Sequence, residues 1–264
     1  MATVTCSDGV RVAYELEGSG PALLLHLGAG CDSTLWRRAG DVEQLSASYT
    51  CVLFDHRGHG ESDKPRGADA YRLDRMTDDV LAVLDELGLD SVAFWGYSAA
   101  VSVGVRLAQR HPERVWSLVA NGAVAPPETP EEIAEWVEAD AQEYREFGWE
   151  KLIEAFEEEE SDPIPEWMKD QIRATDVEQY VNTLETYPDR RWAAWDVLGT
   201  LEAPTLFITG ELEDRADAVG QIVATMPHGE RVRMRGMGHI NAFLASQTVL
   251  SHAVPFLARH RPNG

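Results

Sequence analysis

At residues 91–100 the chain reads SVAFWGYSAA, an apolar run that ends in a short segment of small residues. Ser91 to Trp95 is typical of a buried strand, and Val101 to Arg110 follows a helical pattern. A strand that reverses into a helix within so few residues holds the residue at the turn in a strained backbone. Ser98 stands there, so its hydroxyl should project outward, with the amide of Ala99 and the positive end of the helix aimed at whatever the serine attacks. A tight turn with a capping serine is the alternative.

The flanking sequence alternates β-rich apolar runs with helical patterns, as a parallel sheet with crossover helices requires. Further strands are predicted at residues 10–16, 22–27, 51–55, 115–121, 205–210 and 230–235. After Ala125 the pattern changes to prolines and then to acidic helical stretches rich in aromatic residues, without a strand-like run before Pro204. We therefore predict an α/β core (residues 1–125 and 200–264) interrupted by a helical insertion (residues 126–199).

The composition and charge of the chain disfavour some classes of function. The 264 residues are 44% hydrophobic and 26% charged, which is ordinary for a folded globular chain. A net charge of -22 disfavours nucleic acid and anionic membrane surfaces, because phosphates would be repelled. The segment 128–196 holds 22 acidic and 6 basic residues, so it carries most of the imbalance.

No apolar run approaches the roughly 20 residues of a membrane span, and no secretory leader is evident. Cys6, Cys31 and Cys51 form no metal or CxxC pattern, which favours a cytoplasmic location. No cofactor is expected, since a phosphate-binding glycine loop and a metal-ligand cluster are both lacking. The expected partner is a small-molecule substrate, and a homo-oligomer is left open.

Two more segments carry a family resemblance. Residues 23–30 (LLLHLGAG) resemble an oxyanion loop after a strand, and residues 54–65 (FDHRGHGESDKP) resemble a DxRGxGxS segment. With the turn at Ser98, the chain resembles the α/β-hydrolase fold superfamily over nearly its whole length, in particular the small cytoplasmic serine hydrolases with a helical cap. The resemblance implies a mostly parallel, eight-stranded sheet flanked by helices, with the insertion as the cap. The chain departs from the pattern at Leu27 and Ala100, where the family usually has glycine.

A serine nucleophile needs a base whose pKa lies near 7, and histidine is the natural candidate. His239, in the sequence RGMGHIN, matches the family's Gly-x-Gly-His context, whereas the counterparts of His26 and His56 shape loops. For the acid, Glu213 and Asp214 both fit, and Asp214 is favoured, which gives the order Ser98, Asp214, His239.

The oxyanion hole would combine the amide of Ala99 with that of Gly28, or of Leu27 as the alternative.

The cap should set substrate shape. Two or three of its aromatic residues are expected to touch substrate; the candidates are Trp136, Tyr144, Trp149, Trp167, Tyr180, Trp192 and Trp195. The acidic run Glu157 to Glu160 is interpreted as a solvated helix face or loop. Repulsion by the acidic cap disfavours strongly anionic substrates and favours a neutral ester, lactone or related carbonyl compound.

Two other readings compete with a serine hydrolase. One is a non-hydrolytic enzyme on the same fold, such as a cofactor-free haloperoxidase, a lyase or a cyclase, and the other is a receptor or carrier that binds a ligand. Epoxide and haloalkane hydrolysis are disfavoured, because relatives with those activities have aspartate at the position of Ser98. The sequence does not identify the physiological substrate.

Overall fold

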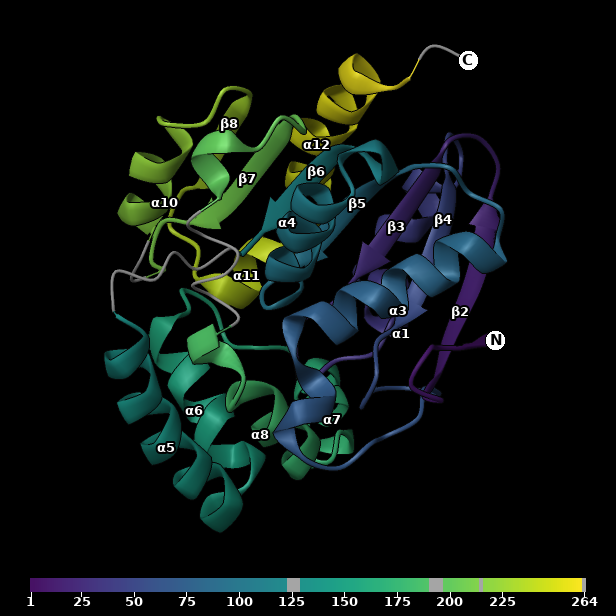
Figure 1. Cartoon of the computed structure of the whole chain (residues 1–264). Coiled ribbons are helices and arrows are strands. Elements are labelled where there is room, and N and C mark those ends of the chain that lie inside the picture. The colour runs from purple at the N-terminus through teal and green to yellow at the C-terminus, as the bar shows by residue number, and fades with distance from the viewer. Residues whose placement is uncertain (123–128, 190–196, 214–215, 263–264) are drawn as a thin grey trace.

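Figure 1 shows the chain as a computed structural model, which describes residues 1–122, 129–189, 197–213 and 216–262. The described residues form one eight-stranded sheet in the order β1-β2-β4-β3-β5-β6-β7-β8. Its strands are β1 (Ala2–Thr5), β2 (Arg11–Gly18), β3 (Ala22–His26), β4 (Thr50–Asp55), β5 (Val92–Tyr97), β6 (Val115–Asn121), β7 (Thr205–Gly210) and β8 (Gly229–Met234). Strand β2 pairs antiparallel with β1 and β4, and the other pairs are parallel. The predicted mostly parallel sheet is confirmed.

The central strands β3, β5, β6 and β7 are buried along almost their whole length, as expected of parallel strands covered on both faces. The pairing aligns their carboxyl ends: His26 pairs with Gly96, Tyr97 with Asn121, and Asn121 with Ile208. The loops that follow these strands therefore emerge along one edge of the sheet.

Helices cover both faces of the sheet (Figure 1). Phe94 of β5 packs in a cluster with residues of α3, α4 and α10, whereas its neighbour Trp95 packs in a second cluster with residues of α1, α2, α11 and α12. Adjacent strand residues point to opposite faces, which explains the two clusters. These helices are α1 (Thr34–Ala39), α2 (Asp41–Leu45), α3 (Leu73–Glu86), α4 (Ala100–Arg110), α10 (Ala216–Val223), α11 (His239–Leu244) and α12 (Ser246–His260). Single 3-10 turns lie at Ala68–Tyr71, Pro112–Arg114 and Leu198–Thr200.

Between β6 and β7, residues 129–189 form the helices α5 (Pro130–Phe147), α6 (Trp149–Glu159), α7 (Glu166–Ala174) and α8 (Val177–Leu184). Helix α5 begins with a capping box, in which Thr129 and Glu132 each accept from the other's backbone N–H. In Figure 1 these helices lie beyond the carboxyl ends of the strands, and their apolar residues, such as Ile133 and Ile172, join the cluster of α1 and α11. The predicted domain limits remain a prediction, since the boundary at 125/126 lies outside the described residues.

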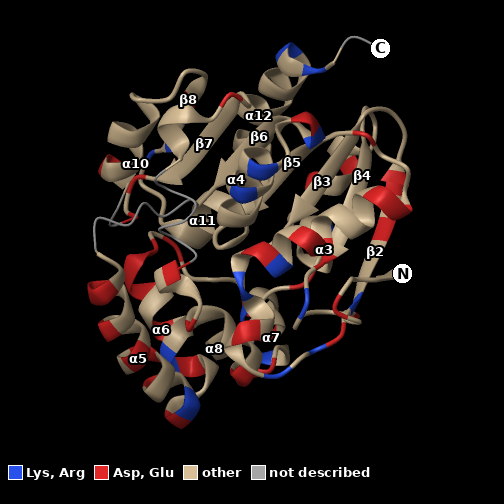
Figure 2. Ribbon diagram, viewed as in Figure 1, with Lys and Arg blue, Asp and Glu red and all other residues tan. Residues whose placement is uncertain are grey.

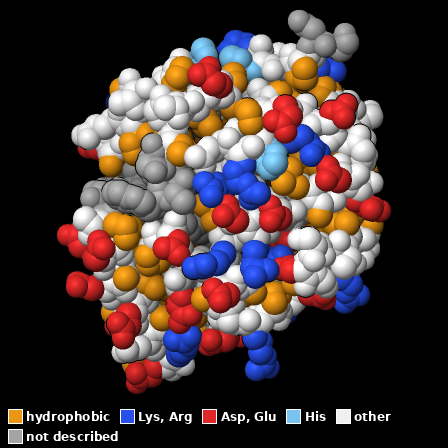
Figure 3. Space-filling view, viewed as in Figure 1, with side chains coloured by type: hydrophobic (Ala, Val, Ile, Leu, Met, Phe, Trp, Pro, Cys, Tyr) orange, Lys and Arg blue, Asp and Glu red, His pale blue; other side chains and the backbone are white. Residues whose placement is uncertain are grey.

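Acidic residues gather on α5 and α6 (Figure 2), and the surface over these helices carries many red groups in Figure 3. Some acidic residues of the insertion are paired: Arg145 contacts Glu178 and Glu185, and Arg173 contacts Glu150. Within the described ranges, no helix combines the length and apolar character that a bilayer span needs.

Candidate active site

Ser98 occupies the turn between β5 and α4, where the sequence placed it. Its φ of 56° is the one positive value among the described non-glycine residues. A left-handed backbone costs a non-glycine residue roughly 1–2 kcal/mol, so the surrounding fold must hold it in place. The N–H of Ser98 donates to the carbonyl of Asn121 at 2.8 Å, which fixes the turn against β6.

Glycines let the strand and helix approach each other around this turn. A Cβ at Gly96 would lie 3.0 Å from the backbone of Ala100 and Val101, and one at Gly104 would lie 2.5 Å from Phe94. Ala100 is the first residue of α4 and is buried. The departure from the family pattern at position 100 therefore leaves the turn intact, because the closest approaches occur at Gly96 and Gly104.

His239 is the first residue of α11 and lies beside a carboxylate. Its Nδ1 is 3.2 Å from Oε2 of Glu213, and both side chains are less than 10% exposed. The other carboxylate oxygen of Glu213 accepts the N–H of Gly210 at 2.5 Å, so the end of β7 fixes the acid. The structure thus brings the alternative acid to the imidazole, whereas the favoured Asp214 lies outside the described residues.

The surroundings of His239 favour its charged form. Burial alone would lower the pKa of the imidazole, but the hydrogen bond and charge of Glu213, with the charges of Glu160 and Glu159, outweigh burial and raise that pKa above its ordinary value. The ring of Tyr97 stacks on the imidazole with centroids 4.9 Å apart, and its hydroxyl donates to the carbonyl of His239 at 3.3 Å.

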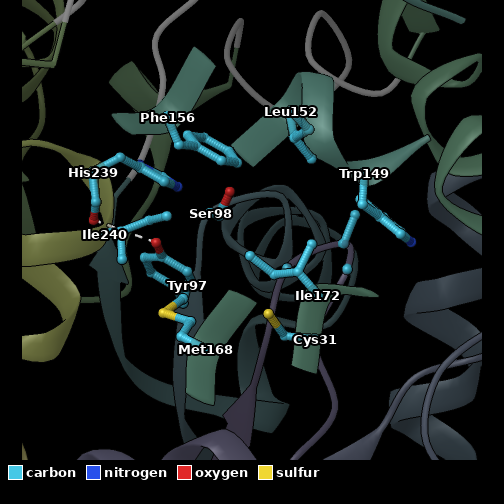
Figure 4. Close-up of a pocket in the computed structure, with 13 residues that line it drawn as sticks. Cys31, Tyr97, Ser98, Trp149, Leu152, Phe156, Met168, Ile172, His239 and Ile240 are labelled. Atoms are coloured by element: carbon cyan, nitrogen blue, oxygen red, sulfur yellow. Dashed lines mark hydrogen bonds between the residues drawn. The ribbon is translucent and has the colours of Figure 1, made fainter. Parts of the chain in front are cut away.

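Ser98 and His239 line the same pocket, and Figure 4 shows the imidazole and the hydroxyl directed toward one another. The hollow measures about 400 Å³, including its opening to solvent. Helices α6 and α7 supply one wall, and the loops after the strands supply the other. The lining residues are Gly28, Ala29, Gly30, Cys31, Tyr97, Ser98, Trp149, Leu152, Phe156, Met168, Ile172, His239 and Ile240.

The loop after β3 packs directly against the serine turn. A Cβ at Gly28 would lie 2.8 Å from Cβ of Ser98 and 3.2 Å from the amide nitrogen of Ala99, so only a glycine fits here without a shift. Gly28 lines the pocket, whereas Leu27 is 1% exposed and belongs to the apolar core. This placement favours Gly28 over Leu27 as the residue beside a bound carbonyl.

The segment after β4 supports that loop. Nε2 of His59 accepts the N–H of Gly30 at 2.8 Å. Two residues earlier, Arg57 is 1% exposed and donates to both carboxylate oxygens of Asp79 at 2.6 Å and to Asp8 at 2.9 Å. The DxRGxG segment thus anchors the pocket wall through a buried ion pair. His26 and His56 are buried, their rings stack 5.1 Å apart, and neither lines the pocket.

Of the aromatic residues proposed for the cap lining, Trp149 is the one found in the pocket wall among those described. Tyr180 packs edge-on against Trp149, and Tyr144 packs in the same way against Tyr180, so these two support the wall from behind. Trp192 and Trp195 lie outside the described residues. Sequence reasoning missed Phe156, whose ring is parallel to that of His239 at 5.9 Å.

Glu160 was also missed, since the run Glu157 to Glu160 was interpreted as solvated. Its two carboxylate oxygens accept the N–H groups of Ile240 and Asn241 at 2.5 and 3.0 Å. The interpretation is therefore wrong for Glu160, although Glu158 and Glu159 are exposed. Periodicity gave no signal, because α6 ends at Glu159 and the contact is made by the residue that follows.

Among the residues that the structure describes, no three His, Cys, Asp or Glu side chains are grouped so that they could hold a metal ion.

Comparison with known proteins places this architecture in a family. A family model described as "alpha/beta hydrolase fold" matches residues 21–246, so the chain belongs to the α/β-hydrolase family. Among solved structures, it is similar to a thermophilic esterase from Thermogutta terrifontis, with a TM-score of 0.86, 22% identity and 99% of each chain covered. It is also similar to the enol-lactonase from Burkholderia xenovorans LB400, with a TM-score of 0.82, 24% identity, and 97% of this chain and 100% of that chain covered. At these identities, the two structures support the fold alone.

A curated relative, the uncharacterized hydrolase YraK of Bacillus subtilis (strain 168), is 31% identical over 111 residues, which is 42% of this chain. The match covers 40% of YraK, so the chain spans about two fifths of the length of that relative.

Proposed function

We propose that this protein is a serine hydrolase that cleaves a neutral ester, lactone or related carbonyl compound. Ser98 is the nucleophile, His239 the base, Glu213 the acid, and the amides of Gly28 and Ala99 form the oxyanion hole. One observation carries the proposal: His239, in contact with buried Glu213, faces the same apolar pocket as Ser98, whose backbone is held at a φ of 56°. Strain at a pocket residue is typical of functional positions.

The reaction proceeds in two halves. Nε2 of His239 takes the hydroxyl proton as Oγ of Ser98 attacks the carbonyl carbon, while Glu213 holds the Nδ1–H and stabilises the imidazolium. The negative oxygen of the tetrahedral intermediate faces the two backbone amides, a type of contact worth about 3 kcal/mol in the transition state for one donor. The intermediate collapses, the alcohol leaves with the proton from His239, and water then releases the acid from the acyl-serine in the same manner.

The pocket favours a neutral substrate. Most of its lining side chains are apolar, and no lysine or arginine is among the lining residues that the structure describes. Three carboxylates, those of Glu213, Glu159 and Glu160, act on His239 and would repel an anionic acyl group. The names of the two similar structures, an esterase and an enol-lactonase, agree with cleavage at a carbonyl group.

We place the protein in the cytoplasm. Cys6, Cys31 and Cys51 are buried and unpaired, as expected of a chain that folds in a reducing compartment. Burial raises the pKa of the Cys51 thiol to about 11, so this group stays protonated at neutral pH.

Covalent labelling tests the proposal. A fluorophosphonate probe should label the native protein, and peptide mapping should place the adduct on Ser98. A panel of p-nitrophenyl esters of increasing chain length, with lactones and matched esters carrying a free carboxylate, should show turnover of the neutral members. Ser98→Ala should lower kcat by about 10⁴-fold or more. Ser251→Ala, at an exposed position of α12, serves as the matched control.

Full ester turnover by Ser98→Ala, or a probe adduct on another residue, would refute the assignment. Peroxide-dependent halogenation without ester cleavage would instead favour the non-hydrolytic alternative.

A further inference from the structure

The end of α6 and the start of α11 meet beside the imidazole. Asp162 and Glu160 both contact the α11 segment: the side-chain amide of Asn241 donates to the carbonyl of Asp162 at 2.9 Å, and the carboxylate of Glu160 accepts two backbone N–H groups. Residues of the insertion thus form hydrogen bonds with the α11 segment that carries His239.

Helix α11 cannot cap itself. The first N–H groups of a helix have no partner within it, and a side chain at the N-cap position usually accepts one of them. Here the N-cap is Gly238, which has no side chain to offer. Instead, the two carboxylate oxygens of Glu160 accept the N–H groups of the two residues that directly follow His239.

The fit at this junction is tight. A Cβ at Gly238 would lie 2.5 Å from the carbonyl oxygen of Glu159 and 2.7 Å from Cδ of Glu160. Glycine at 238 therefore lets the insertion approach the histidine segment closely. Phe156, one helical turn before Glu160, adds a second contact by lying parallel to the imidazole ring.

We propose that Glu160 is a positioning residue for His239, through which the helical insertion fixes the base over Ser98 and stabilises its imidazolium form. The inference rests on the proposed function, since it assigns Glu160 a part in the same acid-base step. Its two hydrogen bonds orient the backbone from which the imidazole projects, and its negative charge favours the positive ring.

The groups around the imidazole come from three directions. Glu213 follows β7, Tyr97 ends β5, and Glu159 and Glu160 come from the end of α6. Glu213 contacts the imidazole directly. Burial lowers the pKa of His239, and the hydrogen bond with Glu213 is the largest of the effects that raise it. Loss of the Glu160 charge should therefore weaken, but not abolish, the preference for the charged ring.

Two variants remove the charge and the acceptor oxygens of Glu160 in steps. Glu160→Gln keeps one oxygen as acceptor and removes the charge, whereas Glu160→Ala removes both functions. Glu158→Gln is the matched control, because it makes the same chemical change at an exposed position of α6. Thermal unfolding of each variant establishes that it is folded.

The main readout is the titration of the His239 ring by ¹⁵N NMR in the full-length protein, which does not depend on turnover. In Glu160→Gln the midpoint should move to lower pH than in the native protein, and in Glu158→Gln it should not move. For ester turnover, the acid limb should shift in the same direction, and Glu160→Ala should lose roughly tenfold or more in kcat with little change in KM.

Equal His239 midpoints in the native protein and Glu160→Gln, with kcat unchanged, would overturn the inference. A lower melting temperature in Glu160→Ala, with an unaltered pH profile, would do the same, because it would show a merely structural role. If the native protein is not labelled at Ser98, the proposed function fails, whereas the ring titration still decides whether Glu160 acts on His239.

Discussion

Replacing Glu213 by glutamine tests the assignment of the acid. Both oxygens of this carboxylate are acceptors: one takes the N–H of Gly210 at 2.5 Å, and the other lies 3.2 Å from Nδ1 of His239. A glutamine side chain offers only one oxygen, so its NH₂ group must face either Gly210 or the imidazole. If the NH₂ faces the imidazole, it favours the ring form with the proton on Nε2, which cannot accept a proton from Ser98.

Glu213→Gln lowers either kcat or the free energy of unfolding, depending on which way the NH₂ group faces. The wrong ring form lowers kcat by about 10³- to 10⁴-fold in comparable triads, and that loss equals about 4–5.5 kcal/mol in the activation free energy. If the NH₂ faces Gly210 instead, a buried N–H loses its acceptor, at a cost of about 1–3 kcal/mol of the free energy of unfolding. Either orientation is therefore measurable.

The assay compares Glu213→Gln with Asp214→Asn, which makes the same change at the neighbouring position that the sequence favoured. If the NH₂ of Glu213→Gln faces the imidazole, steady-state kinetics on the best ester should show the large loss of kcat with KM little changed, and if it faces Gly210 the loss should be in stability. Asp214→Asn should lose less than about threefold in kcat. Urea unfolding of both variants measures stability. The opposite result, with Asp214→Asn inactive and Glu213→Gln active, would refute the assignment of Glu213.

Three further predictions follow from named contacts. Because only the neutral imidazole of His239 accepts a proton and its pKa is raised above the ordinary 6.5, activity should fall as pH drops through a midpoint above that value; a profile flat to pH 4 would contradict this. Gly122→Ala would place a Cβ 2.7 Å from Cε1 of His239 and should lose about 100-fold in activity. Gly148→Ala, with a positive φ of 69° but open space around its Cβ, should lose only about 1–3 kcal/mol of stability. Arg57→Leu leaves Asp79 buried without its cation and should cost about 3–5 kcal/mol of the free energy of unfolding in urea, and a loss below about 1 kcal/mol would disprove the role of the pair.

The strands were largely predictable from sequence. Residues 115–121 and 205–210 match β6 and β7 as predicted, because both have an apolar centre and lie in the buried middle of the sheet. Strand β1 was not predicted, since it is a four-residue edge strand with mostly exposed side chains. Residues 243–257 follow one helical pattern in the sequence, but the structure divides this stretch into α11 and α12 at Ala245.

Spacing along the chain could not resolve contacts between distant segments. It allowed both Glu213 and Asp214 and we favoured Asp214, because spacing does not show how the segment after β7 brings Glu213 back to the N–H of Gly210. The contact of Glu160 could not be predicted for a related reason, since its partners, Ile240 and Asn241, lie about 80 residues further along the chain. The residue types at the turn and at the histidine carried the family pattern, whereas the pocket walls depend on helix packing, which periodicity does not determine.

The division of the pocket between two parts of the chain has a consequence for how the protein could diversify. The proposed catalytic residues Ser98, Glu213 and His239 lie in the segments that follow β5, β7 and β8. The pocket residues Trp149, Leu152 and Ile172 come from the insertion. Substitutions in that stretch can reshape the entrance and select different compounds while the reacting atoms stay where they are. We expect Glu160 to be the exception, since its carboxylate holds the backbone of the two residues that follow His239.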